Sequence, residues 1–452
     1  MKLALIGGGG VRAPEFVRGA LAFAADLDLK ELWLMDIQAE RLNIIAPLCQ
    51  EVAGSHFRVI ATQNLDEALR GASMIVTTIR AGFEQGRVLD ERIALKHNVI
   101  GQETTGPGGF AMAMRSVPAL IEIAARAEAL APTAWTFNFT NPAGLVAQTL
   151  HMAGYRRIVG ICDSANAAQH EVAAWLKVDN DAVKTEVFGL NHLSWARQAM
   201  VNGRDVLPEV LADDAFIQAT HLRFFGGPFV RRMGMFLNEY LFYYYLRDVA
   251  LSRLQDEEIT RGEEVQMLNQ RLFESLQGLS PKDAFATYDA YNLRRSASYM
   301  AAAEADEALR EARSNPTQDV RPVHQQQMVG GYAGVALRTG LALTQNRPLR
   351  IGLNVPNGTS IHGMRPDDVV EVTCEVDGSG IHPIYIGDIP ESHYLLMRTV
   401  KHYERLAATA ILKRDKMIAV EAMAAHPLVG SYPLAETLVN EYIAAHKLEG
   451  WH

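Results

Sequence analysis

The stretch MKLALIGGGGVRAPEF, residues 1–16, decides how the fold of this chain is interpreted. Residues 2–6 form a short apolar run typical of a buried strand, and helical periodicity resumes only after the glycines. The four glycines are therefore expected to form a turn that lets the backbone approach a diphosphate at the start of the next helix. Gly7 and Gly9 match the first two positions of the dinucleotide fingerprint, although the third small position is imperfect. A glycine-rich turn that binds no ligand is the alternative that this stretch leaves open.

A second apolar run, residues 31–35, ends at Asp36, at about the 20-residue separation at which a carboxylate accepts hydrogen bonds from ribose hydroxyls. Further short apolar runs alternate with helical stretches. These runs are FRVIAT (57–62), SMIVTTI (73–79), TAWTFNF (133–139) and RIVGI (157–161). The alternation predicts an α/β fold with a Rossmann-type, doubly wound parallel sheet, whose ligands bind beyond the carboxyl ends of the strands. We expect the nicotinamide dinucleotide NAD to bind there.

The second half of the chain has a different pattern. It combines long amphipathic helical stretches with one strand-rich piece, residues 369–387. This predicts an NAD-binding domain over residues 1–194 and a mixed α+β domain for substrate binding and oligomerisation over residues 195–452. Arg294 and Arg295, at the start of one helical stretch, are candidates for an anionic substrate group, although a solvated helix charge is the commoner explanation.

Composition narrows the class of protein. The 452 residues are 48% hydrophobic and 21% charged, as in globular proteins, and the net charge of -9 argues against nucleic-acid binding. No apolar run has the length of a membrane span, and the chain begins directly with a strand, so we expect a cytoplasmic protein without a membrane partner. Three widely separated cysteines make no disulfide framework, which favours a reducing compartment.

Cys162 and His192 form the first candidate for chemistry beyond a dinucleotide. Cys162 ends one apolar run, and His192 follows another in FGLNHLSW. A thiolate and an imidazole at one end of a sheet can hold a divalent metal, and only two protein ligands leave coordination positions open for substrate and water. Read singly, Cys162 is more often a small buried hydrophobe and His192 a satisfied core histidine.

The tyrosine-rich stretch NEYLFYYYLRD, residues 238–248, is the second candidate. An aromatic helix face in the core accounts for most of its rings. One tyrosine could be an exception, since a metal or a cationic nicotinamide nearby lowers the pKa of a phenol and enables it to act as a base.

Together the motifs IGGGG, GQETTGPGG, NFTNPAG, GIC, GLNH and YLFYYY resemble glycoside hydrolase family 4, the NAD- and manganese-dependent glycosidases. The motifs occur in the family's order from residue 1 to about residue 430. The resemblance implies an overall fold like that of lactate and malate dehydrogenases. It also implies a redox route to hydrolysis, in which NAD oxidises the sugar at C3, a base removes the C2 proton, the aglycone leaves from C1 and water adds back.

The resemblance also assigns roles to particular residues. It makes Cys162 and His192 metal ligands and Tyr240 the C2 base, with Tyr244 as the second choice. The residues that it places at substrate or cofactor are Asn141, Arg92 and Glu103 at the sugar, and Gly7, Gly9, Asp36 and Thr78 at NAD. A surface ion pair is the alternative for Arg92 and Glu103.

The chain departs from the usual family pattern at three places. GVRAPE stands where many members have Ser-x-x-Thr-Pro, so Arg12 adds a cation that could serve the NAD diphosphate or a substrate phosphate. Asp163 follows the metal cysteine as in many members that cleave 6-phospho-α-glucosides, but Ser164 and Ala165 stand where those members have Met-Pro; Asp163 could protonate the leaving group or orient a ligand. The proline common before the tyrosines is absent, which weakens the assignment of Tyr240.

These observations predict a hydrolase of 6-phosphorylated glucosides, with the β linkage favoured, that uses NAD and Mn²⁺ or another divalent metal. We expect it to form a homodimer or homotetramer. The rival is an NAD-dependent hydroxy-acid dehydrogenase of the lactate and malate type, whose Gly-Glu-His-Gly turn is absent here. An NAD-binding sensor without chemistry, and a family member acting on another anionic glycoside, are further alternatives.

Overall fold

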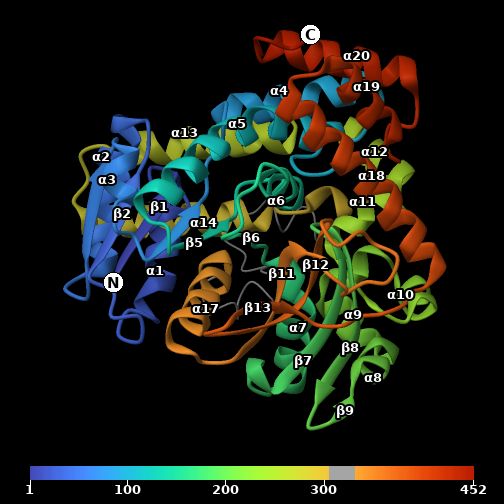
Figure 1. The fold of residues 1–452 in the computed structure, drawn as a ribbon, viewed down its shortest axis with the longest axis horizontal. Coiled ribbons are helices and arrows are strands. Elements are labelled where there is room, and N and C mark those ends of the chain that lie inside the picture. The colour runs from blue at the N-terminus through green and yellow to red at the C-terminus, as the bar shows by residue number, and fades with distance from the viewer. Residues whose placement is uncertain (305–330) are drawn as a thin grey trace.

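A computed structural model of the chain describes residues 1–304 and 331–452. Within these residues a nine-stranded sheet runs through the molecule in the order β13-β12-β11-β6-β5-β4-β1-β2-β3 (Figure 1). In the same described part, no helix combines the length and the apolar character needed to cross a membrane.

The first six strands form the Rossmann core. Their bounds are β1 (Lys2–Ile6), β2 (Glu31–Met35), β3 (Arg58–Thr62), β4 (Met74–Thr77), β5 (Trp135–Asn138) and β6 (Ile158–Gly160). All neighbours among them pair in parallel, in the order 3-2-1-4-5-6 that characterises a doubly wound dinucleotide-binding sheet. The predicted fold class is therefore confirmed.

Strands from the second half extend this sheet. They are β11 (Leu349–Pro356), β12 (Val369–Asp377) and β13 (Gly380–Pro383), and all pair antiparallel. The junction is the bridge between Asn354 of β11 and Gly160 of β6. The division at residue 194 stays a prediction, and the large sheet takes its strands from both sides of it.

A smaller antiparallel sheet lies beside the extension. It contains β7 (Val183–Leu190), β8 (Leu193–Val201), β9 (Arg204–Asp205) and β10 (Phe236–Leu237). The Val187 amide of β7 donates to Thr373 Oγ1 of β12 at 2.9 Å, which ties the two sheets together. The tight turn between β7 and β8 contains His192, and this attachment fixes its place beside the large sheet.

Helices of the first half alternate with the parallel strands along the chain. They are α1 (Ala13–Leu21), α2 (Ala39–Ala53), α3 (Leu65–Leu69), α4 (Phe83–Lys96), α5 (Pro107–Leu130), α6 (Ala143–Met152) and α7 (Ala167–Leu176). Helix α1 begins at Ala13, directly after the glycine turn, with Pro14 in its first turn, where a missing N–H costs nothing. The glycine turn expected from the sequence is confirmed.

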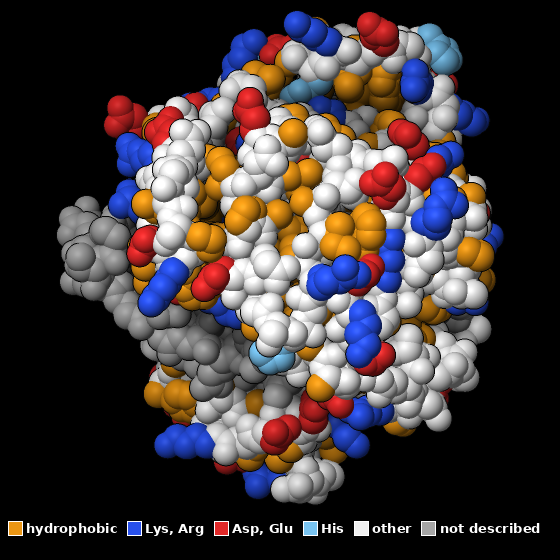
Figure 2. Space-filling view, turned by 90° about the vertical axis from the view of Figure 1, so that its left-hand side faces the viewer, with side chains coloured by type: hydrophobic (Ala, Val, Ile, Leu, Met, Phe, Trp, Pro, Cys, Tyr) orange, Lys and Arg blue, Asp and Glu red, His pale blue; other side chains and the backbone are white. Residues whose placement is uncertain are grey.

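The remaining helices belong to the second half. They are α8 (Leu207–Ala212), α9 (Asp214–Ala219), α10 (Gly227–Met233), α11 (Phe242–Tyr245), α12 (Arg247–Asp256), α13 (Arg261–Leu276), α14 (Pro281–Ala297), α17 (Gly331–Gln345), α18 (Glu391–Lys413), α19 (Lys416–Ala425) and α20 (Tyr432–Ala445). Helix α13 packs on α4, and α14 packs on α2, so the second half closes over the carboxyl ends of the parallel strands (Figure 1). On the face drawn in Figure 2, basic and acidic side chains are interspersed without a basic stripe.

Candidate active site

One large cavity lies at the carboxyl ends of the parallel strands. Its volume of 1560 Å³ exceeds the roughly 300–1,000 Å³ typical of a site for one small molecule, so it has room for a dinucleotide and a second ligand. The turns after β1, β2, β4, β5 and β6 all reach it, through Gly7, Asp36, Thr78, Asn141 and Cys162. The expectation of a single crevice at these strand ends is confirmed.

The glycine turn and Asp36 form a cradle at one end of the cavity. Gly7 has a φ of +98°, and a Cβ there would lie 2.8 Å from the backbone of Thr78, so only glycine fits. The Gly9 amide donates to Asp36 Oδ2 at 3.0 Å and holds the carboxylate at the end of β2. This cradle, open to backbone approach and edged by a carboxylate, fits NAD.

Gly9 itself does not line the cavity, whereas Gly10 does. A Cβ on Gly9 would lie 3.0 Å from the carboxyl group of Asp36. Gly9 is thus placed behind the cradle, where it permits the close approach of Asp36, rather than facing a ligand.

The structure brings Cys162 and His192 together. Cys162 Sγ lies 3.2 Å from His192 Nε2, although 30 residues separate them in the chain. His192 has a φ of +120°, an unfavourable conformation for a non-glycine residue that the β7–β8 turn imposes and that aims its ring at the sulfur. Burial lowers the pKa of His192 to about 4, so the imidazole is neutral and available as a ligand at neutral pH.

This pair fits a divalent metal with an open coordination sphere. Both side chains line the cavity, and sulfur and imidazole nitrogen are ligands that several transition metals accept. Burial, together with nearby Glu371, raises the pKa of the Cys162 thiol, so a bound cation would be needed to favour the thiolate. Over residues 1–304 and 331–452 no cluster of three or more His, Cys, Asp or Glu side chains could hold a metal, so the remaining ligands would be substrate and water.

Tyr240 lies directly against the pair. Its ring stacks on the His192 imidazole with a centroid distance of 3.9 Å and an angle of 2°, and its hydroxyl lies 3.1 Å from that of Tyr299. Burial and the carboxylate of Glu239 raise the pKa of Tyr240 well above its usual value. Tyr244 packs beside His426 and does not line the cavity. Of the two tyrosines that the resemblance offers as the base, only Tyr240 lines the cavity, and Tyr243 of the same stretch also lines it.

Asp163 faces the cavity next to Cys162. Burial raises its pKa to about 6, and the nearby Arg12 guanidinium opposes the shift. Its Oδ1 atom is buried, and no residue in the described part of the chain hydrogen-bonds to it. A carboxyl group with this pKa can carry and release a proton near neutral pH.

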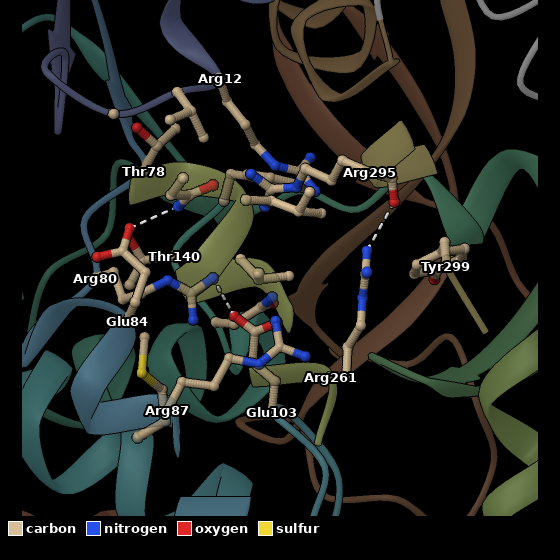
Figure 3. A pocket seen from close by; sticks show the side chains of 18 of the residues that line it. Arg12, Thr78, Arg80, Glu84, Arg87, Glu103, Thr140, Arg261, Arg295 and Tyr299 are labelled. Atoms are coloured by element: carbon tan, nitrogen blue, oxygen red, sulfur yellow. Dashed lines mark hydrogen bonds and ion pairs between the residues drawn. The ribbon is translucent and has the colours of Figure 1, made fainter. Parts of the chain in front are cut away.

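Several arginines from different elements line the cavity, and Figure 3 labels some of them. The labelled arginines are Arg12, Arg80, Arg87, Arg261 and Arg295. The Arg12 guanidinium lies 5.4 Å from the ring centre of Phe139, and no described residue hydrogen-bonds to it. Arg80 Nη1 is buried and has no partner among the described residues. These unused donors make the cavity attractive to an anion.

Glu103 anchors two of these arginines. Its carboxylate lies 2.5 Å from Arg80 Nη2 and 2.8 Å from Arg87 Nη1. Burial by itself would raise the pKa of Glu103, but the two guanidinium groups hold it well below its usual range. Glu103 thus lines the cavity as an anion that fixes the positions of two cations.

The arginines that the sequence offered for the substrate differ from one another in position. Arg92 lies outside the cavity and makes a surface ion pair with Glu263, because it projects from another side of α4 than Arg87, one turn earlier. Arg294 lines the cavity with an exposed side chain, and the neighbouring candidate Arg295 lines it with a half-buried side chain that donates to Tyr291 Oη at 2.7 Å. Sequence reasoning did not identify Arg87, and nothing in its local pattern distinguishes it from Arg92.

Sequence reasoning also missed Glu239 and Tyr299. Tyr299 Oη lies 3.1 Å from both Glu239 Oε1 and Tyr240 Oη, and Glu239 Oε1 accepts from Ser164 Oγ at 2.7 Å. Tyr299 follows α14, about 60 residues after the tyrosine-rich stretch. Only the folded chain shows that these groups share one wall of the cavity.

Comparisons with known proteins identify the family of this chain. The family model described as Family 4 glycosyl hydrolase matches residues 2–178, and the model described as Family 4 glycosyl hydrolase C-terminal domain matches residues 187–429. A relative from Bacillus subtilis (strain 168), named a probable 6-phospho-beta-glucosidase, is 32% identical and covers 99% of this chain and 96% of its own length. A phospho-alpha-glucosidase from Clostridium acetobutylicum is 26% identical and covers 98% of this chain and 97% of its own length.

A solved structure supports the same relationship. The 6-phospho-beta glucosidase from Thermotoga maritima, with manganese, NAD+ and glucose-6-phosphate, has a TM-score of 0.83 and 26% sequence identity. The match covers 99% of this chain and 98% of that one, so the two proteins share the whole architecture.

Proposed function

The chain belongs to glycosyl hydrolase family 4, and from this premise we propose that it hydrolyses 6-phosphorylated glucosides with NAD and a divalent metal, with the β linkage favoured. One observation carries the proposal. The Cys162–His192 pair, with Tyr240 stacked upon it, opens into the same cavity as the cradle of Gly7 and Asp36. A dinucleotide site, an open metal site and a candidate base at one place are the three requirements of a redox-assisted elimination.

In this proposal Cys162 and His192 hold the divalent cation, and the turns that carry Gly7, Gly9, Asp36 and Thr78 hold NAD. When bound, NAD supplies reversible oxidation of a sugar carbon and the cation supplies positive charge to sugar oxygens.

The chain's own side chains do the rest of the chemistry. Burial raises the pKa of Tyr240, so Tyr240 Oη would remove the proton at the sugar C2 only when a bound cation and the cationic nicotinamide lower that pKa, and Asp163 would protonate the oxygen of the leaving group. The pKa of Asp163, raised to about 6 by burial, supports its role as the acid. Asn141, beside the cis peptide bond to Pro142, and Glu103 line the cavity where sugar hydroxyls would lie.

The arginines support an anionic substrate. Arg12 and Arg295 face the cavity, and no described residue hydrogen-bonds to the Arg12 guanidinium. A planar guanidinium donates two parallel hydrogen bonds to a phosphate, which suits the 6-phosphate of the sugar. A carboxylate or sulfonate on the sugar would be attracted to the same donors, which keeps another anionic glycoside as the alternative substrate.

We further propose that the protein works in the cytoplasm as a homodimer or homotetramer. Cys49, Cys162 and Cys374 are all free and buried, and a cysteine ligand requires a reducing environment. Large apolar side chains are exposed on the C-terminal helices α18 to α20, as expected of a surface that meets another copy. These residues are Leu395, Leu412, Met417 and Tyr432. Sedimentation equilibrium of the purified protein tests the oligomeric state.

The test of function is release of nitrophenol from α- and β-linked nitrophenyl 6-phosphoglucosides, each with and without added NAD and Mn²⁺ under reducing conditions. We expect release only with both additions, and faster release from the β-linked compound. The unphosphorylated β-glucoside and a β-glucuronide serve as controls for the anionic group. Release from the glucuronide alone would show that the substrate carries a carboxylate in place of the phosphate. No release from any compound would refute the glycosidase proposal.

A further inference from the structure

Two polar side chains form a hydrogen-bonded series that ends at Nδ1 of the His192 ring, the nitrogen that faces away from Cys162. His192 Nδ1 lies 2.9 Å from Thr104 Oγ1, and Thr104 Oγ1 lies 2.9 Å from Gln102 Oε1. Both partners come from the loop between α4 and α5, in which Glu103 was the residue expected at the site from the sequence. The opposite ring nitrogen, Nε2, is the atom that faces Cys162 Sγ.

The donor and the acceptor of each of these hydrogen bonds can be assigned by starting from Gln102. Gln102 Oε1 accepts the backbone N–H groups of Thr104 at 2.6 Å and Thr105 at 2.8 Å, which identifies it as the amide oxygen. An amide oxygen only accepts, so at 2.9 Å the Thr104 hydroxyl must donate its single proton to it. Thr104 Oγ1 is then an acceptor toward His192, and His192 Nδ1 must carry the ring proton.

The loop that supplies these groups is tightly packed. A Cβ at Gly108 would lie 2.3 Å from the Gln102 carbonyl oxygen, and a Cβ at Gly109 would lie 2.4 Å from the Thr104 carbonyl oxygen. The two glycines thus let the start of α5 press against the loop backbone. The geometry of Gln102 and Thr104 is therefore set before any ligand arrives.

We propose that Thr104, oriented by Gln102, is a positioning residue that fixes His192 as the Nδ1–H tautomer and leaves the lone pair of Nε2 free for a divalent cation. The inference rests on the proposed function, because it concerns the cation that Cys162 and His192 would hold. Such outer hydrogen bonds fix the orientation and tautomer of a ligating histidine. The Tyr240 ring, stacked on the face of the imidazole, restricts the remaining rotation of the His192 ring.

The experiment compares three substitutions in the NAD-bound protein. Thr104→Val removes the hydroxyl with little change in shape, Thr104→Ser restores a hydroxyl, and Thr105→Val is the matched control. Thr105 is adjacent and buried, and no described residue hydrogen-bonds to its Oγ1. Mn²⁺ affinity is measured by electron paramagnetic resonance of the free ion without substrate, and circular dichroism confirms the fold of each variant.

We expect Thr104→Val to weaken Mn²⁺ binding by about 10- to 100-fold, and Thr104→Ser and Thr105→Val by less than about tenfold. In metal-free protein labelled with ¹⁵N-histidine, the His192 signal, assigned with His192→Ala, should report Nδ1–H in the wild type and lose that preference in Thr104→Val. Unchanged affinity of Thr104→Val, equal losses in Thr104→Val and Thr105→Val, or Nε2–H in the wild type would each overturn the inference. Absence of Mn²⁺ binding by the wild type would instead mark failure of the proposed metal site, and the inference would fall with it.

Discussion

Replacing Glu103 by glutamine is expected to destabilise the cavity wall, because two arginines share this carboxylate. The Glu103 side chain is 14% exposed and that of Arg87 is 9% exposed, so their ion pair is largely shielded from water. Removing one partner of a buried pair costs about 3–5 kcal/mol, since the remaining charge stays buried without compensation. Glu91 still neutralises Arg87 at 2.7 Å, so the expected loss in the free energy of unfolding is at the lower end, about 3 kcal/mol.

Glu263→Gln is the matched control for this substitution. Glu263 also pairs with an arginine, but its partner Arg92 is 45% exposed, and ion pairs at the surface contribute about 0–1 kcal/mol. Glutamine can still accept the backbone N–H of Thr260 that Glu263 caps at the start of α13. The expected loss is therefore under about 1 kcal/mol.

Urea unfolding at pH 7 and pH 5, followed by tryptophan fluorescence and compared at a common slope, measures both losses. Burial would raise the pKa of Glu103, but Arg80 and Arg87 hold it well below its usual range. Its stabilisation is therefore complete above the unfolded pKa of about 4.3 and is lost only as the pH falls through the folded value. The loss should be equal at both pH values. A Glu103→Gln protein that unfolds like the wild type, or a control that loses as much, would refute the reasoning.

Three further predictions concern the cofactor, the base and the metal. Gly9→Ala places a Cβ 3.0 Å from the carboxyl group of Asp36, so NAD affinity, measured by calorimetry, should fall about tenfold or more, a cost of about 1.4 kcal/mol; unchanged affinity would speak against the cradle. Tyr240→Phe should lower the rate of aryl-glycoside cleavage by about 100-fold or more, whereas Tyr244→Phe, away from the cavity, should retain it; equal rates for the two variants would exclude Tyr240 as the base. Cys162→Ser should weaken Mn²⁺ binding in a titration and leave NAD affinity as it is, and parallel losses of both would contradict separate sites.

The Rossmann core could be predicted from the sequence because its signals are local. Short apolar runs, a glycine turn and a carboxylate after the second run each reflect one strand and its end, and the structure places all of them as expected. The extension of the sheet by β11–β13 could not be predicted. Its link to the core is a single bridge between Asn354 and Gly160, about 190 residues apart, and such pairing leaves no local pattern.

The direction in which each side chain points could not be predicted from the sequence either. Arg87 and Arg92 lie on one helix, and packing of α13 on α4 decides that the first lines the cavity and the second pairs at the surface. Gly9 satisfies the fingerprint, but its place behind Asp36 depends on how the turn meets β2. The contact of Tyr299 with Tyr240 likewise arises only when α14 folds back over the strands.

In the proposed reaction a proton is removed from the sugar C2 before the glycosidic bond is cleaved. The most direct measurement is cleavage of the nitrophenyl 6-phospho-β-glucoside in D₂O with NAD and Mn²⁺, followed by NMR of the glucose 6-phosphate released. The account predicts deuterium at C2 of the product. A product that retains its C2 proton in full would contradict it and would point to direct displacement between two carboxyl groups.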